Sequence, residues 1–167
     1  MNIYYALVES TRGVERKLCD APIRRIRAFN RYYTVWLDVM NKGYLGMEFS
    51  WPESRVLFEI YGACEISATE LCKRLNMDKS YISRILSRFE KNGFITRKVI
   101  PGSKGVKKIY LTEVGREKAE QINVRADRQM EEKLKHLDEE KRRNLCQAMD
   151  AIETILREND EKTEAGC

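Results

Sequence analysis

The sequence predicts a mainly α-helical protein with one short β-hairpin. Apolar residues recur at helical spacing through most of the 167-residue chain, and near its middle two runs of β-forming residues flank a Pro-Gly turn. The composition, 43% apolar and 34% charged, is typical of a soluble, helix-rich protein, and the length predicts one domain or one domain plus extensions. No segment approaches the roughly 20 consecutive apolar residues of a membrane span.

The N-terminal part is predicted to hold an extension at residues 1–22 and then one long helix. The extension is too apolar for a loose tail, and it could pack on a partner or form a short helix. Its start lacks the basic region and long apolar core of a signal peptide, so we expect a cytoplasmic protein. The helix begins at Asp20-Ala-Pro22, because Pro is tolerated in a first turn, and ends near Asn41.

This helix has an unusually wide apolar face. Residues at helical spacing on it are Ile23, Ile26, Phe29, Tyr33, Trp36, Leu37 and Met40. One small domain does not need a face of this width, so we expect residues 23–49 to contribute to a dimer. Residues 43–46 are the predicted exit loop.

A second helix is predicted to begin at Ser50. Ser50 and Glu53 have the spacing of a capping box, and Pro52 suits the first turn. The helix ends at Gly62, and residues 64–66 are predicted as a short strand that pairs with the hairpin. Its apolar stripe is Val56, Leu57, Ile60 and Tyr61.

Residues 67–93 have the pattern of two short helices joined at Asn76-Met77. Ser67 and Glu70 form another capping box, Asp78 can cap the second helix, and Gly93 stands where a left-handed residue ends it. The second helix has a buried stripe of Ile82, Ile85, Leu86 and Phe89. Its outer face carries Ser80, Ser83, Arg84, Ser87, Arg88 and Lys91.

This arrangement favours a helix-turn-helix whose second helix enters a DNA major groove, although any two bundled helices can show the same pattern. The following residues favour the DNA interpretation. Strand-like runs at 94–100 and 107–112 enclose a turn at 101–105. A helix-turn-helix followed by a basic hairpin is a winged helix, which we place at residues 50–112.

Positive charge is concentrated on this predicted domain. The chain has a net charge of +5, and residues 66–112 contain 11 Lys and Arg against 3 Asp and Glu. Residues 113–167, in contrast, contain 11 against 15. Such a basic patch favours a polyanionic partner, whose binding releases counterions and depends steeply on salt.

Two further helices, within residues 113–158, are predicted to take part in dimerisation. Thr112 can cap the first, which extends to about residue 136, and acidic residues from Asp138 open the second. Residues 158–167 are polar and expected to fray, and 159–167 form a polar tail. The first stripe is Ala119, Ile122, Ala126, Met130 and Leu134, and the second, with coiled-coil-like spacing, is Leu145, Met149, Ile152 and Leu156.

The sequence shows no constellation for catalysis, and no cofactor or metal motif. Nothing pairs a nucleophile with a base, the single histidine, His136, has no evident partner, and no Gly-rich phosphate loop is present. The five cysteines form no CxxC pair, so a structural zinc site is not expected. We expect free thiols, with Cys19, near a helix start, as the candidate for a redox sensor.

From about Ile23 to Leu156 the chain resembles the MarR family of bacterial and archaeal transcription regulators. The resemblance is carried by Trp51–Ile60, Ser67–Leu75, Asp78–Gly93 and Leu111–Gly115. Residues 28–33 look like the MarR half of MarR–acetyltransferase fusions, although we expect no acetyltransferase in this chain. The resemblance implies a homodimer on a pseudo-palindromic operator, with recognition helices about 34 Å apart. It also implies repression of nearby genes, released by small aromatic ligands or oxidation.

Residue roles follow from position in this resemblance. Arg84 is the first choice for a guanine contact, because its fork matches O6 and N7. Tyr81 has an alternative role as a packing residue. Arg88 is expected to meet phosphates, as are residues at helix starts. The predicted DNA-binding residues are Ser67, Thr69, Lys79, Ser80, Tyr81, Ser83, Arg84, Ser87, Arg88 and Lys104.

The resemblance also implies a ligand pocket between the dimer helices and the winged helix. Candidate pocket residues are Phe29, Tyr33, Trp36 and Trp51, although each could equally be ordinary core. A protein–protein interaction module remains the alternative function, since winged helices also bind proteins. The outward Ser and Arg side chains argue against it, because protein interfaces favour Tyr, Trp and Leu.

The wing departs from the family pattern. Family members usually carry Asp-x-Arg there, with the Arg in the minor groove, but the matching residues here are Ser103, Lys104 and Gly105. Lys104 can replace the contact only as a point charge. Arg97 lacks the Asp that might have paired with it.

We therefore predict that Lys104→Ala weakens binding about equally on specific and random DNA, because a point charge contacts phosphates without reading bases. Fluorescence-anisotropy titrations of the variant against both DNAs measure this. A loss confined to the specific site would contradict it.

Overall fold

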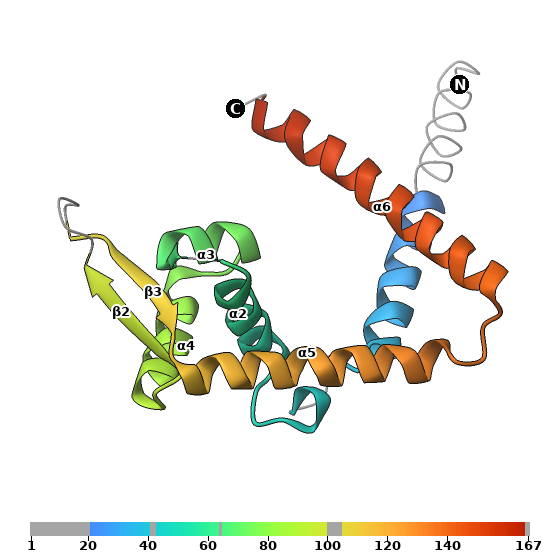
Figure 1. Ribbon diagram of the computed structural model, residues 1–167. Coiled ribbons are helices and arrows are strands. Elements are labelled where there is room, and N and C mark those ends of the chain that lie inside the picture. The colour runs from blue at the N-terminus through green and yellow to red at the C-terminus, as the bar shows by residue number, and fades with distance from the viewer. Residues whose placement is uncertain (1–20, 41–42, 64, 100–104, 166–167) are drawn as a thin grey trace, which may run out of the picture. The chain divides into compact units, whose positions relative to one another are not determined.

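A computed structural model describes residues 21–40, 43–63, 65–99 and 105–165, with side chains as far as residue 160. The described chain is mainly helical with one small antiparallel sheet, which confirms the predicted fold class (Figure 1). It divides into two compact units, Met1–Ala119 and Glu120–Cys167. None of the described helices combines the length and the apolar character needed to cross a bilayer.

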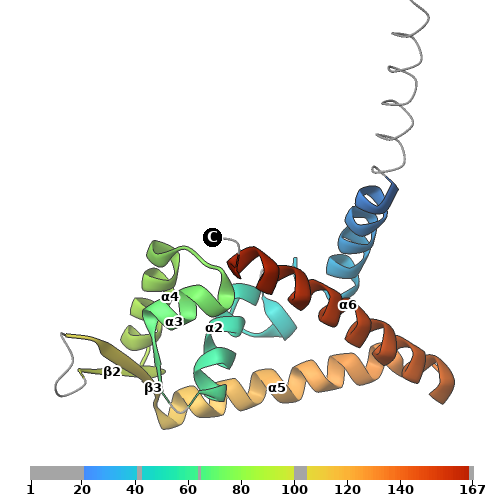
Figure 2. The same cartoon turned by 90° about the horizontal axis from the view of Figure 1, so that it is seen from above.

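The first unit contains a helix at residues 21–36 and then the winged helix. Helices α2, α3 and α4 pack together, and the hairpin of β2 and β3 follows them (Figures 1 and 2). Helix α5 crosses the boundary between the units, and α6 belongs to the second. The labelled elements are η1 (Tyr44–Gly46), α2 (Trp51–Gly62), β1 (Ile66–Ser67), α3 (Ala68–Leu75), α4 (Lys79–Lys91), β2 (Ile95–Val99), β3 (Lys107–Leu111), α5 (Glu113–Leu134) and α6 (Glu139–Ala165).

Strand β3 is the centre of the sheet. It pairs antiparallel with β1 on one side and β2 on the other, in the order β1-β3-β2. Residue Lys108 lies opposite Ser67 of β1 and opposite Lys98 of β2. The hairpin is therefore tied to the start of α3 through a two-residue strand, as the sequence predicted for the segment near Ile66.

Helix starts in the first unit are stabilised by the predicted capping side chains. The Glu53 carboxylate accepts hydrogen bonds from the Ser50 N–H and hydroxyl at 2.8 and 2.9 Å. Ser67 N–H donates to Glu70 at 2.7 Å, and Glu70 N–H donates to the Ser67 hydroxyl at 3.3 Å. These bonds satisfy donors that a helix start otherwise leaves free.

The core of the winged helix is the predicted stripe of α4 packed on α2 and the sheet. Ile82, Ile85, Leu86 and Phe89 are all buried, and burial of each side chain stabilises the fold by roughly 1.5–3 kcal/mol. Three aromatic rings meet edge to face, with centroids 5.6 to 6.0 Å apart. These rings are Phe49, Phe89 and Phe94.

The first turn of α5 approaches the end of α4 very closely. Thr112 N–H donates to the Phe94 carbonyl at 3.0 Å, and the Thr112 hydroxyl donates to the Gly93 carbonyl at 2.6 Å. The same hydroxyl accepts from Gly115 N–H at 3.0 Å, so Thr112 caps α5 as predicted. A Cβ on Gly115 would lie 1.9 Å from the Phe94 carbonyl oxygen, so only glycine fits there.

Two helix ends differ from the sequence prediction. The N-terminal helix ends at residue 36, not near Asn41, because Asp38 adopts a left-handed φ of 58° and its N–H bonds back to Val35. Leu37 and Met40 continue the apolar spacing beyond residue 36, so the spacing did not indicate where the helix ends. The start of this helix lies outside the described residues.

Helix α6 continues to Ala165, so the segment from residue 158 is helical where fraying was expected. No Pro or Gly interrupts it before residue 166, and ion pairs such as Glu153–Arg157 support the helix at i, i+4 spacing.

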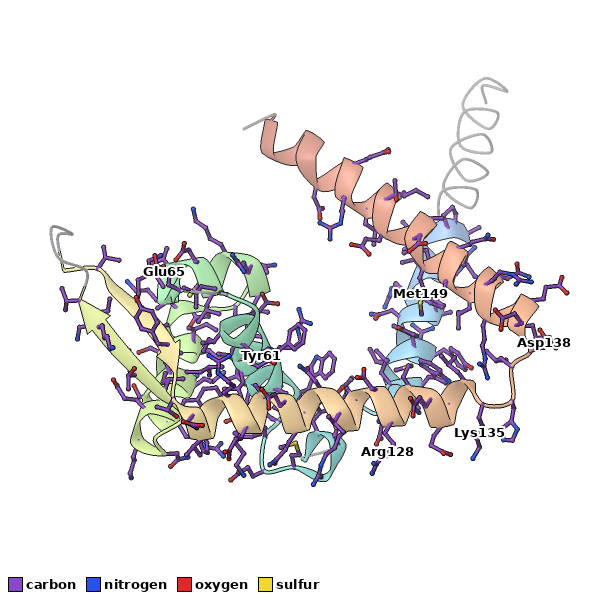
Figure 3. All side chains as sticks on the ribbon, viewed as in Figure 1. Tyr61, Glu65, Arg128, Lys135, Asp138 and Met149 are labelled. Carbon is purple, nitrogen blue, oxygen red and sulfur yellow. The ribbon has the colours of Figure 1, made fainter. Side chains whose placement is uncertain are left out.

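In the second unit, Asp138 opens α6 as predicted. Its carboxylate accepts from Lys141 N–H at 2.8 Å. On the described chain the seam residues of α6 are largely exposed, with Ile152 at 45% and Leu156 at 58%. Met149, labelled on α6 in Figure 3, belongs to the same face.

We predict that Gly115→Ala lowers the free energy of unfolding by about 1–3 kcal/mol, because the new methyl group meets the Phe94 backbone carbonyl. Chemical denaturation monitored by circular dichroism measures this. Gly62→Ala is the control, because a Cβ there would meet no atom within 4 Å beyond its chain neighbours and its own helix backbone. This change should be neutral or stabilising by about 0.4–1 kcal/mol. Equal stability of the Gly115→Ala protein and wild type would refute the proposed close approach.

Candidate DNA-binding surface

The outer face of α4 forms the centre of the candidate surface. Asn76 has a left-handed φ of 48°, which produces the tight turn between α3 and α4. The Asp78 carboxylate then accepts from the N–H groups of Ser80 and Tyr81 at 2.8 and 3.1 Å, and these bonds lower the Asp78 pKa. The predicted outer residues are all exposed: Ser80, Ser83, Arg84, Ser87, Arg88 and Lys91.

Arg84 is available for a base contact. It forms no ion pair with any described residue, and its guanidinium carbon lies 5.6 Å from the centre of the Tyr81 ring. Tyr81 is half-buried, so it combines the packing role with a contact to Arg84. A cation held over an aromatic ring keeps its charge while losing conformational freedom.

Arg88 is already engaged inside the protein. Its guanidinium bonds to the Glu53 carboxylate at 2.5 Å and reaches the Glu48 carbonyl at 3.4 Å. Glu53 is only 8% exposed and also holds the start of α2 through Ser50. Arg88 therefore links α4 to α2, and its predicted phosphate contact competes with this internal bond.

The remaining predicted DNA-binding residues differ in exposure and in their hydrogen bonds. Ser67 is buried and its hydroxyl is used by the α3 cap, whereas Thr69 and Lys79 are exposed. The Ser87 hydroxyl accepts from Arg97 at 3.4 Å. Lys104 lies outside the described residues.

Arg97 on β2 shows how the wing is held without the expected Asp. Its guanidinium pairs with Glu90 near the end of α4 at 2.7 Å. The sequence pattern indicated only that the usual Asp partner of Arg97 is absent. Glu90 precedes Arg97 by seven residues across a tight turn, and that proximity was the signal for the pair.

The sequence did not predict a second ionic cluster, which joins the middle of the wing to the start of α3. Lys108 on β3 lies 3.1 Å from the Glu70 carboxylate and 3.8 Å from that of Glu65. The Tyr110 hydroxyl donates to Glu65 at 3.2 Å, and the Lys98 ammonium lies 5.6 Å from the centre of the Tyr110 ring. Figure 3 labels Glu65, which precedes β1 in the chain.

The cluster shifts the pKa values of its members. Hydrogen bonds from Ser67, and then from Lys108, lower the pKa of Glu70 to about 2. The hydrogen bond to Glu70 raises the pKa of Lys108. Both groups are therefore fully charged at neutral pH.

Several exposed lysines form no ion pair with a described residue. They lie on α3, on α4 and on the two strands of the wing. Within the described ranges they are Lys73, Lys79, Lys91, Lys98 and Lys107.

The four candidate pocket residues fall into two clusters. Phe29, Tyr33 and Trp36 stack along the N-terminal helix with centroids 5.5 and 5.7 Å apart. Trp51 instead packs edge to face on Tyr44 at 4.6 Å, and burial raises the pKa of Tyr44. Trp51 thus has a core partner of its own.

The described cysteines and possible metal ligands form no evident site. Cys72 is half-buried and Cys146 is exposed, both as free thiols, and Cys19 lies outside the described residues. In the described segments no three His, Cys, Asp or Glu side chains gather as a metal ion would require.

The winged helix is similar in sequence to known proteins. Residues 49–104 match the MarR family. A stretch of 90 residues is 32% identical to the uncharacterized HTH-type transcriptional regulator YdgJ of Bacillus subtilis. This similarity covers 54% of the chain and 55% of YdgJ, so the match spans about half the length of that relative.

Solved structures with the same fold cover more of the chain. Apo MarR from E. coli matches with a TM-score of 0.65 at 22% identity, over 75% of this chain and 94% of that one. A mutant E. coli MarR complexed with operator DNA matches with a TM-score of 0.62 at 23% identity, over 79% and 94%. FabT from Streptococcus pneumoniae in complex with DNA matches with a TM-score of 0.65 at 16% identity, over 83% and 97%. These likenesses confirm the winged-helix fold, and residues 49–104 are the part of the chain that matches the MarR family.

We predict a stability contribution from Glu70 that disappears in acid. Its pKa is about 2 in the folded protein and near 4.5 in an unfolded chain, so its contribution is present above about pH 4.5 and is lost as the pH falls toward 2. Wild type and Glu70→Gln are compared by denaturation at pH 7, 4.5, 3 and 2. The wild-type advantage at pH 7 should shrink through this window, and an advantage independent of pH would contradict the shift.

Proposed function

We propose that this chain is a sequence-specific DNA-binding transcription regulator of the MarR type, acting as a homodimeric repressor on a pseudo-palindromic operator. The observation that carries the proposal is the exposed polar face of α4 in a winged helix that matches the MarR family, where Arg84 forms no ion pair with a described residue. DNA-bound relatives of the same fold support this choice. No enzymatic activity is part of the proposal.

In this function the N-terminal half of α4 lies in the major groove. Arg84 donates two parallel hydrogen bonds to a guanine, while Ser80 and Ser83 contact neighbouring base edges. Lys79 and Lys91 approach phosphates at the two ends of the helix, and each releases a counterion. The hydrophobic stripe on the opposite face holds the helix rigidly, which base reading requires.

Dimerisation rests on apolar surface that the described chain leaves exposed. On the N-terminal helix Ile26 is 67% exposed, and on α6 the seam from Leu145 to Leu156 is largely open. A second copy would cover these faces and place two recognition helices about 34 Å apart, one helical turn of DNA.

Release of DNA by a small aromatic ligand or by oxidation is the remaining part of the proposal. The aromatic stack of Phe29, Tyr33 and Trp36 offers flat apolar surface for such a ligand. The competing function is a winged helix that binds an acidic protein partner through the same basic surface.

The test is a fluorescence-anisotropy titration of DNA from upstream of the protein's own gene, and of random DNA, at two salt concentrations. Wild type should bind the upstream DNA more tightly, with two chains per duplex. Arg84→Ala should lose about 5- to 150-fold on that DNA and little on random DNA, because it removes a base contact worth about 1–3 kcal/mol.

Lys91→Ala is the matched control on the same face. It should weaken binding to both DNAs and reduce the salt slope by about one, as expected for a phosphate contact. Equal, salt-sensitive binding of wild type to both DNAs would refute sequence-specific regulation and favour the protein-partner alternative.

A further inference from the structure

We propose that Lys108 is a positioning residue, which fixes the wing relative to the helix-turn-helix and does not itself contact DNA. The inference rests on the proposed function, because its consequence is measured as DNA affinity. It separates two neighbouring wing lysines, Lys107 and Lys108, that look equivalent in the sequence.

Lys108 lies where three elements meet. It is in the central strand β3, opposite Ser67 at the start of α3 and opposite Lys98 of β2. Its ammonium donates to both Glu70 oxygens, at 3.1 and 3.4 Å, and its side chain is only 15% exposed. The bond therefore joins the middle of the wing directly to the first turn of α3.

Glu70 is held in place by Ser67, independently of its bond to Lys108. One of its oxygens accepts the Ser67 N–H at 2.7 Å, and its own N–H donates to the Ser67 hydroxyl. An ion pair to a carboxylate that is already ordered loses less conformational entropy on forming than one between two free side chains. Lys108 thus connects the wing to a rigid point.

The cluster extends from this point onto β2. Lys108 also approaches Glu65, which accepts the Tyr110 hydroxyl, and Lys98 covers the Tyr110 ring. Strand β3 is therefore linked to carboxylates on both sides of β1, and β2 contacts this cluster through Lys98. A two-stranded hairpin is marginally stable by itself, so such links decide its orientation.

Lys108 is poorly suited to a phosphate contact. Its charge is balanced by Glu70 and Glu65, and moving its ammonium to a phosphate would leave two carboxylates unpaired near a polyanion. Lys107 is the opposite case. It points to the other face of the hairpin, is exposed, and forms no ion pair with a described residue.

The experiment compares Lys108→Met, Lys108→Arg, Glu70→Gln and Lys107→Met with wild type. Circular dichroism first establishes that each variant is folded. Anisotropy then gives Kd on upstream DNA over a series of salt concentrations, and hydrogen exchange of the β2 and β3 amides is measured without DNA. Lys107→Met shows how far loss of one exposed wing charge changes the salt slope.

We expect Lys108→Met and Glu70→Gln to raise Kd about five- to tenfold with an unchanged salt slope, and to speed exchange in the wing. Lys108→Arg, which keeps the ion pair, should restore both values. A slope reduced by about 0.9 in Lys108→Met would identify a phosphate contact and overturn the proposal. Unchanged Kd and unchanged exchange in Lys108→Met would overturn it as well.

The exchange measurement separates this inference from the proposed function. If wild type binds neither DNA, the regulator function fails, while faster wing exchange in Lys108→Met and Glu70→Gln still identifies the link. If wild type binds upstream DNA specifically and exchange in Lys108→Met is unchanged, the positioning role fails alone.

Discussion

The contact between the first turn of α5 and the end of α4 is the constraint on which the winged helix depends. Thr112 bonds to the carbonyls of Gly93 and Phe94, and Gly115 leaves room for the Phe94 carbonyl. The end of α4, the end of β3 and the start of α5 all meet at this contact. The Leu-Thr-x-x-Gly segment at 111–115 thus has a physical cause: a hydroxyl that serves two helix ends and a position without Cβ.

Ion pairs divide the basic residues of the domain into two groups. Arg88, Arg97 and Lys108 each pair with a carboxylate on another element, so they hold the recognition helix and wing in place. The exposed lysines and Arg84 keep their charge for an external partner. Net charge alone overstates the number of phosphate contacts, because an internally paired cation releases no counterion when DNA binds.

Much of the candidate surface was predictable because its causes are local. The caps at Ser67 and Asp78 and the buried stripe of α4 follow from spacings of two to four residues. The missed contacts join distant residues: Glu53 and Arg88 are 35 apart, and Glu70 and Lys108 are 38 apart. No periodic pattern reports such pairs, because charged surface residues have many possible partners until the fold brings two of them together.

Local sequence patterns were enough to predict the order and type of the elements, the wing, and the outward face of α4. These depend on helix and strand periods, capping side chains and turn residues, all of which act over a few positions. Three features became apparent only in the fold: the end of the N-terminal helix at residue 36, the packing of Trp51 on Tyr44, and which of the described cations form ion pairs. These outcomes depend on distances between elements, which packing sets and local sequence does not encode.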